Sequence, residues 1–89
     1  MWSVYVLYSA VREKSYVGYS QDVEKRLAEH NAGHVASTKS GRPWQLIAVE
    51  KFETSLEARR QEAFLKTTTG RRRLAGMFKS IVLTHPPKV

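Results

Sequence analysis

Apolar and polar residues alternate along residues 2–9, and this alternation predicts a strand. Successive side chains of a strand point to opposite faces of its sheet, so alternate positions share a face. One face holds Trp2, Val4, Val6 and Tyr8, and the other holds Ser3, Tyr5, Leu7 and Ser9. The charged stretch 10–15 is typical of a hairpin loop, and residues 15–19 are the expected partner strand, with Tyr16 and Gly18 on one face.

A helical pattern follows over residues 20–31, with Ser20 as the expected N-cap and Gly33 as a C-terminal stop. The stripe of this helix that should face the core ends in His30, and Arg26 lies beside that stripe one turn earlier. Side chains four apart on a helix point the same way, so the two should lie together. A lone histidine on an apolar face is usually a core residue. Because Arg26 lies beside His30, a functional role for His30 carries the same weight as a role in the core.

Residues 33–43 predict a basic loop of mostly small side chains that includes Lys39 and Arg42. Such a loop can follow a phosphate backbone, or it can simply connect two elements. Residues 44–52 predict a third strand. Its run from Leu46 to Val49 is apolar throughout, which predicts burial on both faces and a central position in the sheet.

A capping-box pattern over residues 54–57 opens a second predicted helix, expected to reach Lys66. On this helix Glu62 shares a face with small and apolar residues, and burying an unpaired carboxylate is costly. Its partner is expected to be a structural arginine or a metal ion. Residues 67–70 should break the helix, and residues 71–78 should form a short basic helix.

Length and composition limit the class of protein. The chain has 89 residues, enough for one small domain, expected over residues 1–83 with a loose tail at 84–89. It has no cysteine, which excludes disulfides and thiolate metal sites. No signal peptide and no run near the roughly 20 apolar residues of a membrane span is visible. A soluble cytoplasmic protein that does not contact membranes is therefore expected.

The net charge of +7 is distributed unevenly. Residues 1–62 hold nine Lys and Arg against eight acids, whereas residues 63–89 hold six and no acid. A basic, acid-free terminal third predicts a polyanionic partner, most simply nucleic acid, with an ordinary solubilising surface as the alternative. The candidate nucleic-acid-binding residues are Lys39, Arg42, Lys66, Arg71, Arg72 and Arg73.

In their order and spacing, these motifs resemble the GIY-YIG nuclease superfamily. Its two name-giving tripeptides correspond to Ser3–Tyr5 and Tyr16–Gly18, and the Arg–His pair four residues apart also fits. Ser3 departs from the family's glycine, at a position that is not itself chemical. The resemblance covers nearly the whole chain. It is greatest to small stand-alone bacterial members, which look like the N-terminal nuclease domain found in the excision-repair excinuclease.

The resemblance implies an α+β fold, a three-stranded antiparallel sheet flanked by helices in the order β-β-α-β-α-α. It also implies an endonuclease that hydrolyses phosphodiester bonds of nucleic acid, expected to be DNA, in DNA repair or recombination. One divalent metal ion, Mg²⁺ or Mn²⁺, would be held by Glu62, because Mg²⁺ commonly binds one or two carboxylates and keeps several waters.

Carried over by position, the catalytic set is Tyr5, Tyr16, Arg26, His30 and Glu62. Arg26 would stabilise charge that develops on the phosphoryl group. Either tyrosine would act as general base or orient the attacking water. An ordinary tyrosine has a pKa of about 10, so the metal and nearby cations must lower that pKa or His30 must take the proton. The geometry tests this hypothesis: it gains support if all five side chains line one concave surface, and it fails if Tyr5 and Tyr16 lie on opposite faces of the sheet.

Two other functions compete with this hypothesis. A nucleic-acid-binding module could keep the fold without cutting, since the basic segments favour binding in either case. A protein-interaction domain could instead dock its basic C-terminal segment on an acidic partner. Shared fold does not decide among these functions, so the arrangement of the site must.

Overall fold

The computed structural model of the chain describes residues 1–74 and confirms the predicted order of strands and helices. The elements are β1 (Trp2–Ser9), β2 (Lys14–Ser20), α1 (Val23–Ala32), the 3-10 helix η1 (Ala36–Gly41), β3 (Trp44–Phe52) and α2 (Ser55–Leu65). A further helix begins at residue 68 and reaches residue 74, the last that is described. The fold is α+β, with a three-stranded antiparallel sheet flanked by helices.

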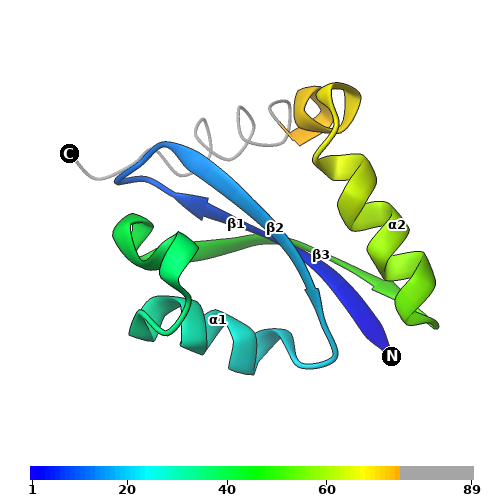
Figure 1. Cartoon of the computed structure of the whole chain (residues 1–89), viewed down its shortest axis with the longest axis horizontal. Helices are drawn as coiled ribbons and strands as arrows, with labels where there is room; N and C mark the ends of the chain where they lie inside the picture. The colour runs from blue at the N-terminus through cyan, green and yellow to red at the C-terminus, as the bar shows by residue number, and fades with distance from the viewer. Residues whose placement is uncertain (75–89) are drawn as a thin grey trace.

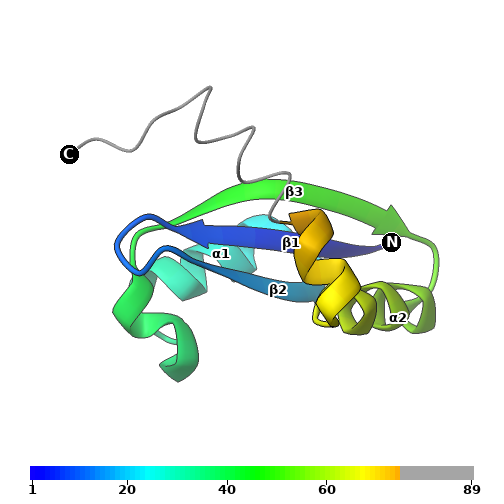
Figure 2. The ribbon, with the colours of Figure 1, turned by 90° about the horizontal axis from the view of Figure 1, so that it is seen from above.

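The strands lie in the order β2-β1-β3, with β1 between its two neighbours (Figure 2). The predicted central position of residues 44–52 is therefore wrong: β3 is an edge strand, and Val49 is 44% exposed. The register shifts between Val6 and Leu7 of β1, so Ile47 of β3 has no partner there. Leu46 packs in the core under α1, whereas at the bulge the consecutive residues Ile47 and Ala48 both pack against the other core, so an apolar run occurs here in an edge strand.

Helices α1 and α2 cover opposite faces of the sheet (Figure 1). On one face Val4, Val6 and Val17 pack with α2, and on the other Tyr5 and Leu7 pack with α1. The two faces follow directly from the alternation of β1, whose side chains are mostly buried on both sides. The central strand thus supplies two cores, and its tyrosine belongs to the core under α1.

The start of α1 differs from the prediction by two residues. Asp22 is the N-cap, and its carboxylate accepts a hydrogen bond from the Lys25 backbone N–H. Ser20 cannot take this role because it is still in the sheet, paired with Ser3. The C-terminal stop is confirmed: Gly33 has φ of 83°, a left-handed conformation that suits glycine.

Residues 33–43 are not an irregular loop, because they contain η1. Side-chain hydrogen bonds fix this segment against the sheet. Ser9 Oγ donates to Gly41 O, and Trp44 Nε1 donates to Thr38 O. The Asn31 side chain donates to Trp44 O and accepts from the Trp44 backbone N–H. Thr38 is consequently buried although its neighbours in η1 are largely exposed. A basic, small-residue composition alone gave no sign of these long-range contacts.

The helix start predicted at Thr54 is confirmed: Thr54 is the N-cap of α2, its hydroxyl accepts a hydrogen bond from the Glu57 backbone N–H and donates one to the Glu57 carboxylate. The break after α2 is shorter than predicted, since the next helix begins at residue 68 instead of 71. Gly70 lies inside that helix, where a Cβ would come 2.1 Å from Phe64 O. The glycine permits close packing of the two helices. The predicted helix end near residue 78 and the tail at 84–89 lie outside the described residues.

Candidate active site

Tyr5 and Tyr16 lie on the same face of adjacent strands, beneath α1. In the register of β1 and β2, Tyr5 is opposite Gly18 and Leu7 is opposite Tyr16. The two tyrosine rings are 6.4 Å apart between centroids. Gly18 has no side chain, and the Tyr5 ring occupies the space above it: a Cβ there would lie 2.5 Å from Tyr5 Oη. The glycine therefore sets where the Tyr5 hydroxyl lies.

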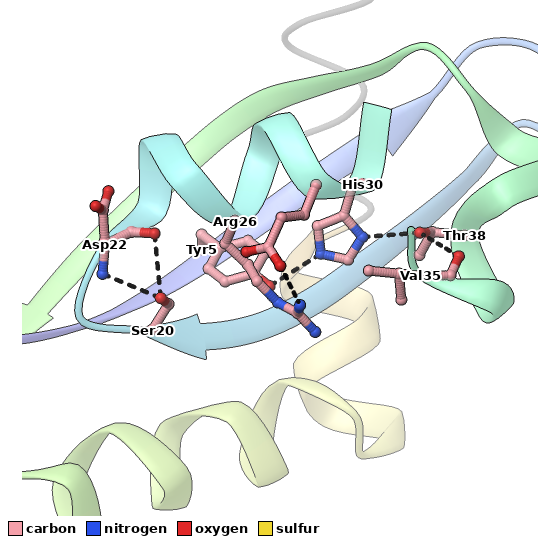
Figure 3. A network of polar contacts seen from close by, with 8 residues as sticks. Tyr5, Ser20, Asp22, Arg26, His30, Val35 and Thr38 are labelled. Atoms are coloured by element: carbon pink, nitrogen blue, oxygen red, sulfur yellow. Dashed lines mark hydrogen bonds and ion pairs between the residues drawn. The ribbon is translucent and has the colours of Figure 1, made fainter. Parts of the chain in front are cut away.

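A chain of hydrogen bonds leads away from the Tyr5 hydroxyl into the protein (Figure 3). Tyr5 Oη is 3.1 Å from His30 Nε2, and His30 Nδ1 is 2.7 Å from Thr38 Oγ1. The Thr38 hydroxyl donates to Val35 O at 3.3 Å. Because the Thr38 hydroxyl proton is used in this bond, the Thr38 oxygen accepts a hydrogen bond from His30 Nδ1–H. His30 Nε2 then accepts from the Tyr5 O–H.

His30 is both a core residue and a member of this chain of contacts. It is fully buried, with an exposed fraction of 0%, and its ring packs edge-on to Tyr16 at 4.8 Å. Burial, followed by the positive charge of Arg26, lowers the pKa of His30 below its ordinary value. The imidazole is therefore neutral at neutral pH and able to accept a proton at Nε2.

Tyr5 remains protonated at neutral pH. Burial, followed by the proximity of Tyr16, raises the pKa of Tyr5, and this outweighs a hydrogen bond from Arg26 that acts in the other direction. Arg26 projects from α1 towards the same hydroxyl and also forms an ion pair with Glu29 at 3.6 Å. A protonated Tyr5 cannot by itself remove a proton from water, so another group must receive one.

A pocket of about 610 Å³ opens beside these side chains. Four of the five candidate catalytic residues line it: Tyr5, Tyr16, Arg26 and Glu62. The fifth, His30, does not reach the pocket and lies behind Tyr5. Four of the five side chains thus share one concave surface, and His30 does not, because the helix face that carries it is buried against the sheet.

Glu62 reaches the pocket from α2, although α2 covers the other face of the sheet. Its side chain is 21% exposed and forms an ion pair with Lys66 one turn later, with 3.5 Å between Oε1 and Nζ. The expected partner was a structural arginine or a metal ion; within the described residues, the side chain paired with Glu62 is that of a lysine. The sheet ends at β2, so a side chain from α2 can pass that edge and meet the tyrosine pocket.

The pocket fits a hydrated divalent ion held by few protein ligands. Among residues 1–74, no three His, Cys, Asp or Glu side chains are grouped to bind a metal. Glu62 is a partly exposed carboxylate of this pocket, whose lining also includes Asp22 and Glu29, and the volume leaves room for waters. Mg²⁺ retains several waters and commonly uses one or two carboxylates, so this donor set is compatible with it.

The predicted nucleic-acid-binding residues fall into separate places. Lys39 and Arg42 lie at η1 and line neither this pocket nor its neighbour, and Arg42 donates from Nε to Lys39 O. Arg73 packs its guanidinium over the Phe64 ring, 5.2 Å from the centroid, and Arg72 is exposed. Lys66 and Arg71 line a second pocket, beyond β2.

Three residues with no predicted role are important in the geometry of the site. Lys25 lines the pocket as an exposed cation, next in sequence to Arg26. Thr38 fixes the tautomer of His30, and Gly18 makes room for Tyr5. Only Gly18 had a sequence signal, as part of the second name-giving tripeptide. A glycine inside a strand often marks a close approach.

Comparison with known proteins agrees with this arrangement. The model of the GIY-YIG catalytic domain matches residues 1–75. The chain therefore belongs to the GIY-YIG family, whose catalytic domain indicates a nuclease-type function.

Its relatives include proteins named UPF0213. One from Staphylococcus saprophyticus is 43% identical over 60 residues, covering 66% of this chain and 73% of that protein. One from Listeria welshimeri is 52% identical over 52 residues, covering 57% and 58%. The solution NMR structure of a UPF0213 protein from Bacillus halodurans has a TM-score of 0.52 and 31% identity, over 86% of this chain and 85% of that one. Within residues 1–74, no helix has the length and apolarity to cross a membrane.

Proposed function

We propose that the chain is a divalent-metal-dependent endonuclease that hydrolyses phosphodiester bonds of nucleic acid, most simply DNA. One observation carries the proposal. Tyr5 lines a pocket together with Tyr16, Arg26 and Glu62, while its hydroxyl is hydrogen-bonded to His30, which lies outside that lining. A structural tyrosine needs one hydrogen-bond partner, whereas this one has an acceptor and a cation at a pocket shared with a carboxylate.

The direction of the hydrogen bonds supports a role for His30 as the final proton acceptor. In this mechanism the attacking water gives a proton to Tyr5 Oη as the Tyr5 proton passes to His30 Nε2. The water oxygen forms a bond to phosphorus, the bond to the leaving oxygen breaks, and that oxygen takes a proton from solvent. The raised pKa of Tyr5 and lowered pKa of His30 are compatible with a relay and disfavour a permanently ionised Tyr5.

Arg26 and Glu62 supply the charges that the reaction needs. Arg26 lies beside Tyr5 in the pocket and would stabilise negative charge on the phosphoryl oxygens. Glu62 would hold the Mg²⁺ or Mn²⁺ ion, which when bound supplies Lewis-acid stabilisation of that charge. Tyr16, partly exposed in the same pocket, would orient the attacking water.

The test compares the parent with Glu62→Gln on branched, flapped, nicked and plain DNA and on RNA, with Mg²⁺ or Mn²⁺. Cleavage by the parent that is lost in Glu62→Gln, with nucleic-acid binding retained, supports the proposal. Glu50→Gln is the matched control, because Glu50 is an exposed acid that does not line the pocket. Paramagnetic broadening by Mn²⁺ should reach Glu62, Tyr5 and Tyr16, and an unaffected Glu62 would refute the metal assignment.

A second candidate is a nucleic-acid-binding module that does not cut. The Glu62–Lys66 ion pair favours it, because a lysine at 3.5 Å occupies the carboxylate that a metal would use. Both side chains are partly exposed, and exposed pairs contribute only about 0–1 kcal/mol, so a divalent ion can displace the lysine. Absence of cleavage by the parent on every substrate, with binding intact, would favour the module.

A further inference from the structure

A second pocket lies beside the first, on the α2 side of the sheet. Its volume is about 610 Å³, equal to that of the active-site pocket. Tyr16 belongs to the lining of both pockets, and Val17, which points to the α2 face, lines only the second. β2 is an edge strand, so the two pockets meet across a free edge of the sheet.

Three cations from three different elements line this second pocket. They are Lys14 at the start of β2, Lys66 at the end of α2, and Arg71 in the following helix. The lining contains one acid, Glu13. Within residues 1–74, Lys14 and Arg71 form no ion pair, so their charges are available to a ligand. The composition of the wall therefore favours an anion.

The rest of the wall is apolar and aromatic apart from Ser15. Leu65 and Leu74 line the pocket together with Val17, and all three belong to the core cluster under α2. The ring of Tyr8 lies in the same lining. A pocket lined by both cations and apolar side chains suits a ligand with a phosphate and a planar base, such as one nucleotide of a strand.

The two pockets are joined by an ion pair. Glu62 lines the active-site pocket, Lys66 lines the second pocket, and their side chains meet at 3.5 Å. A phosphate in the second pocket and a divalent ion at Glu62 would each replace one half of this pair. A phosphate bound by Lys66 would thus leave Glu62 free for the metal ion, and a metal ion bound by Glu62 would leave Lys66 free for the phosphate.

We propose that the second pocket binds the nucleic-acid strand next to the bond that is cut, so that the strand passes over the edge of β2. Lys14 and Arg71 hold its phosphates, and the apolar wall contacts a base. This inference rests on the proposed nuclease function, which defines the first pocket as the place of cleavage. It assigns Lys14 and Tyr8 to substrate binding. It places Arg71 and Lys66 at one site, apart from Lys39 and Arg42.

The experiment measures binding in EDTA, so that it does not depend on cleavage. A fluorescein-labelled single-stranded DNA is titrated with protein at several NaCl concentrations, and anisotropy gives Kd. Each phosphate contact contributes about 0.7 to the slope of log Kd against log salt for single strands. The double variant Lys14→Gln/Arg71→Gln should therefore lower the slope by about 1.4.

The matched control is Arg59→Gln/Arg60→Gln. It removes the same charge from exposed positions of α2 that line neither pocket, and its slope should remain that of the parent. Equal losses in both double variants would show general attraction to a basic surface and would overturn the proposal. No loss in either variant, or no binding by the parent, would overturn it as well. Thermal unfolding and the two single variants verify that the substituted proteins are folded.

A labelled poly-glutamate peptide separates nucleic acid from an acidic protein partner. Binding of this peptide as tight as that of DNA, with the same dependence on Lys14 and Arg71, would overturn the proposal. With a cleavable substrate, the Lys14→Gln/Arg71→Gln variant should raise KM and leave kcat nearly unchanged. If Glu62→Gln shows that the parent does not cleave, the nuclease proposal fails while the salt slopes still decide whether a strand occupies this pocket.

Discussion

Replacing Gly18 by alanine should displace the Tyr5 hydroxyl and reduce cleavage much more than stability. The added Cβ would lie 2.5 Å from Tyr5 Oη, 2.6 Å from Tyr5 Cζ and 3.1 Å from Tyr16 Cε1. Since carbon contacts relax at about 3.5 Å, the tip of Tyr5 must move by about 1 Å. Tyr5 is 1% exposed and bonded to His30, so it cannot turn freely away.

Two magnitudes follow from this displacement. Overpacking a buried site costs about 1–3 kcal/mol of unfolding free energy, which urea denaturation measures. A catalytic group misplaced by about 1 Å lowers the rate on the order of 10²-fold. In steady-state kinetics on the substrate that the parent cleaves, the loss should appear in kcat, because Gly18→Ala alters the position of a reacting group and leaves the cations of the pocket in place.

Exposed Ser15, in the same strand, supplies the control. Comparing Ser15→Ala with Ser15→Gly measures what alanine and glycine cost in β2 without a steric neighbour. Tyr5→Phe in the Gly18→Ala background removes the 2.5 Å contact and should recover part of the stability. A folded Gly18→Ala protein that cleaves within about threefold of the parent would refute the argument, since the expected loss is on the order of 10²-fold.

Three further predictions concern the neighbours of this hydroxyl. Because burial lowers the pKa of His30, its contribution to stability is complete above about pH 6.5 and is lost as pH falls through the folded-state pKa. Urea denaturation of the parent and His30→Gln should show a smaller difference at acid pH than at neutral pH; equal differences would contradict it. Thr38→Val leaves the buried His30 Nδ1–H without an acceptor and should cost about 1–3 kcal/mol in the same assay, whereas exposed Thr69→Val should cost little. Lys66→Gln should raise the Mn²⁺ affinity at Glu62 by about 1.5- to 5-fold in a calorimetric titration, because that factor corresponds to the free energy of an exposed ion pair. An unchanged affinity would contradict this prediction.

The sequence allowed prediction of what depends on neighbouring residues. The limits of β1 and β3, the helix start at Thr54 and the stop at Gly33 are local patterns, and the structure confirms them. The order of strands depends on pairing between distant segments. For β3, an apolar run over a bulge at Ile47 produced the same pattern as a central strand.

The site combines both kinds of information. Alternation placed Tyr5 and Tyr16 on definite faces of their own strands, but the register of β2 against β1 decided that these faces coincide. Helical spacing placed Arg26 beside His30, yet only burial distinguishes them: the arginine lines the pocket and the histidine does not. The approach of Glu62 around the edge of the sheet depends on the position of α2, which no local pattern indicates.

The 3-10 helix η1, whose structure was least evident from the sequence, determines the direction of the proposed proton relay. Burying Tyr5 and His30 requires partners for their polar atoms, and within residues 1–74 no buried side-chain nitrogen or oxygen lacks one. The chain of donors from Tyr5 ends at a backbone carbonyl, Val35 O, just before η1. Because a carbonyl only accepts, Thr38 must donate to it, His30 must donate to Thr38, and Nε2 must face Tyr5 without a proton. If η1 were free to move, the tautomer of His30 would be undetermined, so this 3-10 helix, far in sequence from Tyr5, determines which atom can receive its proton.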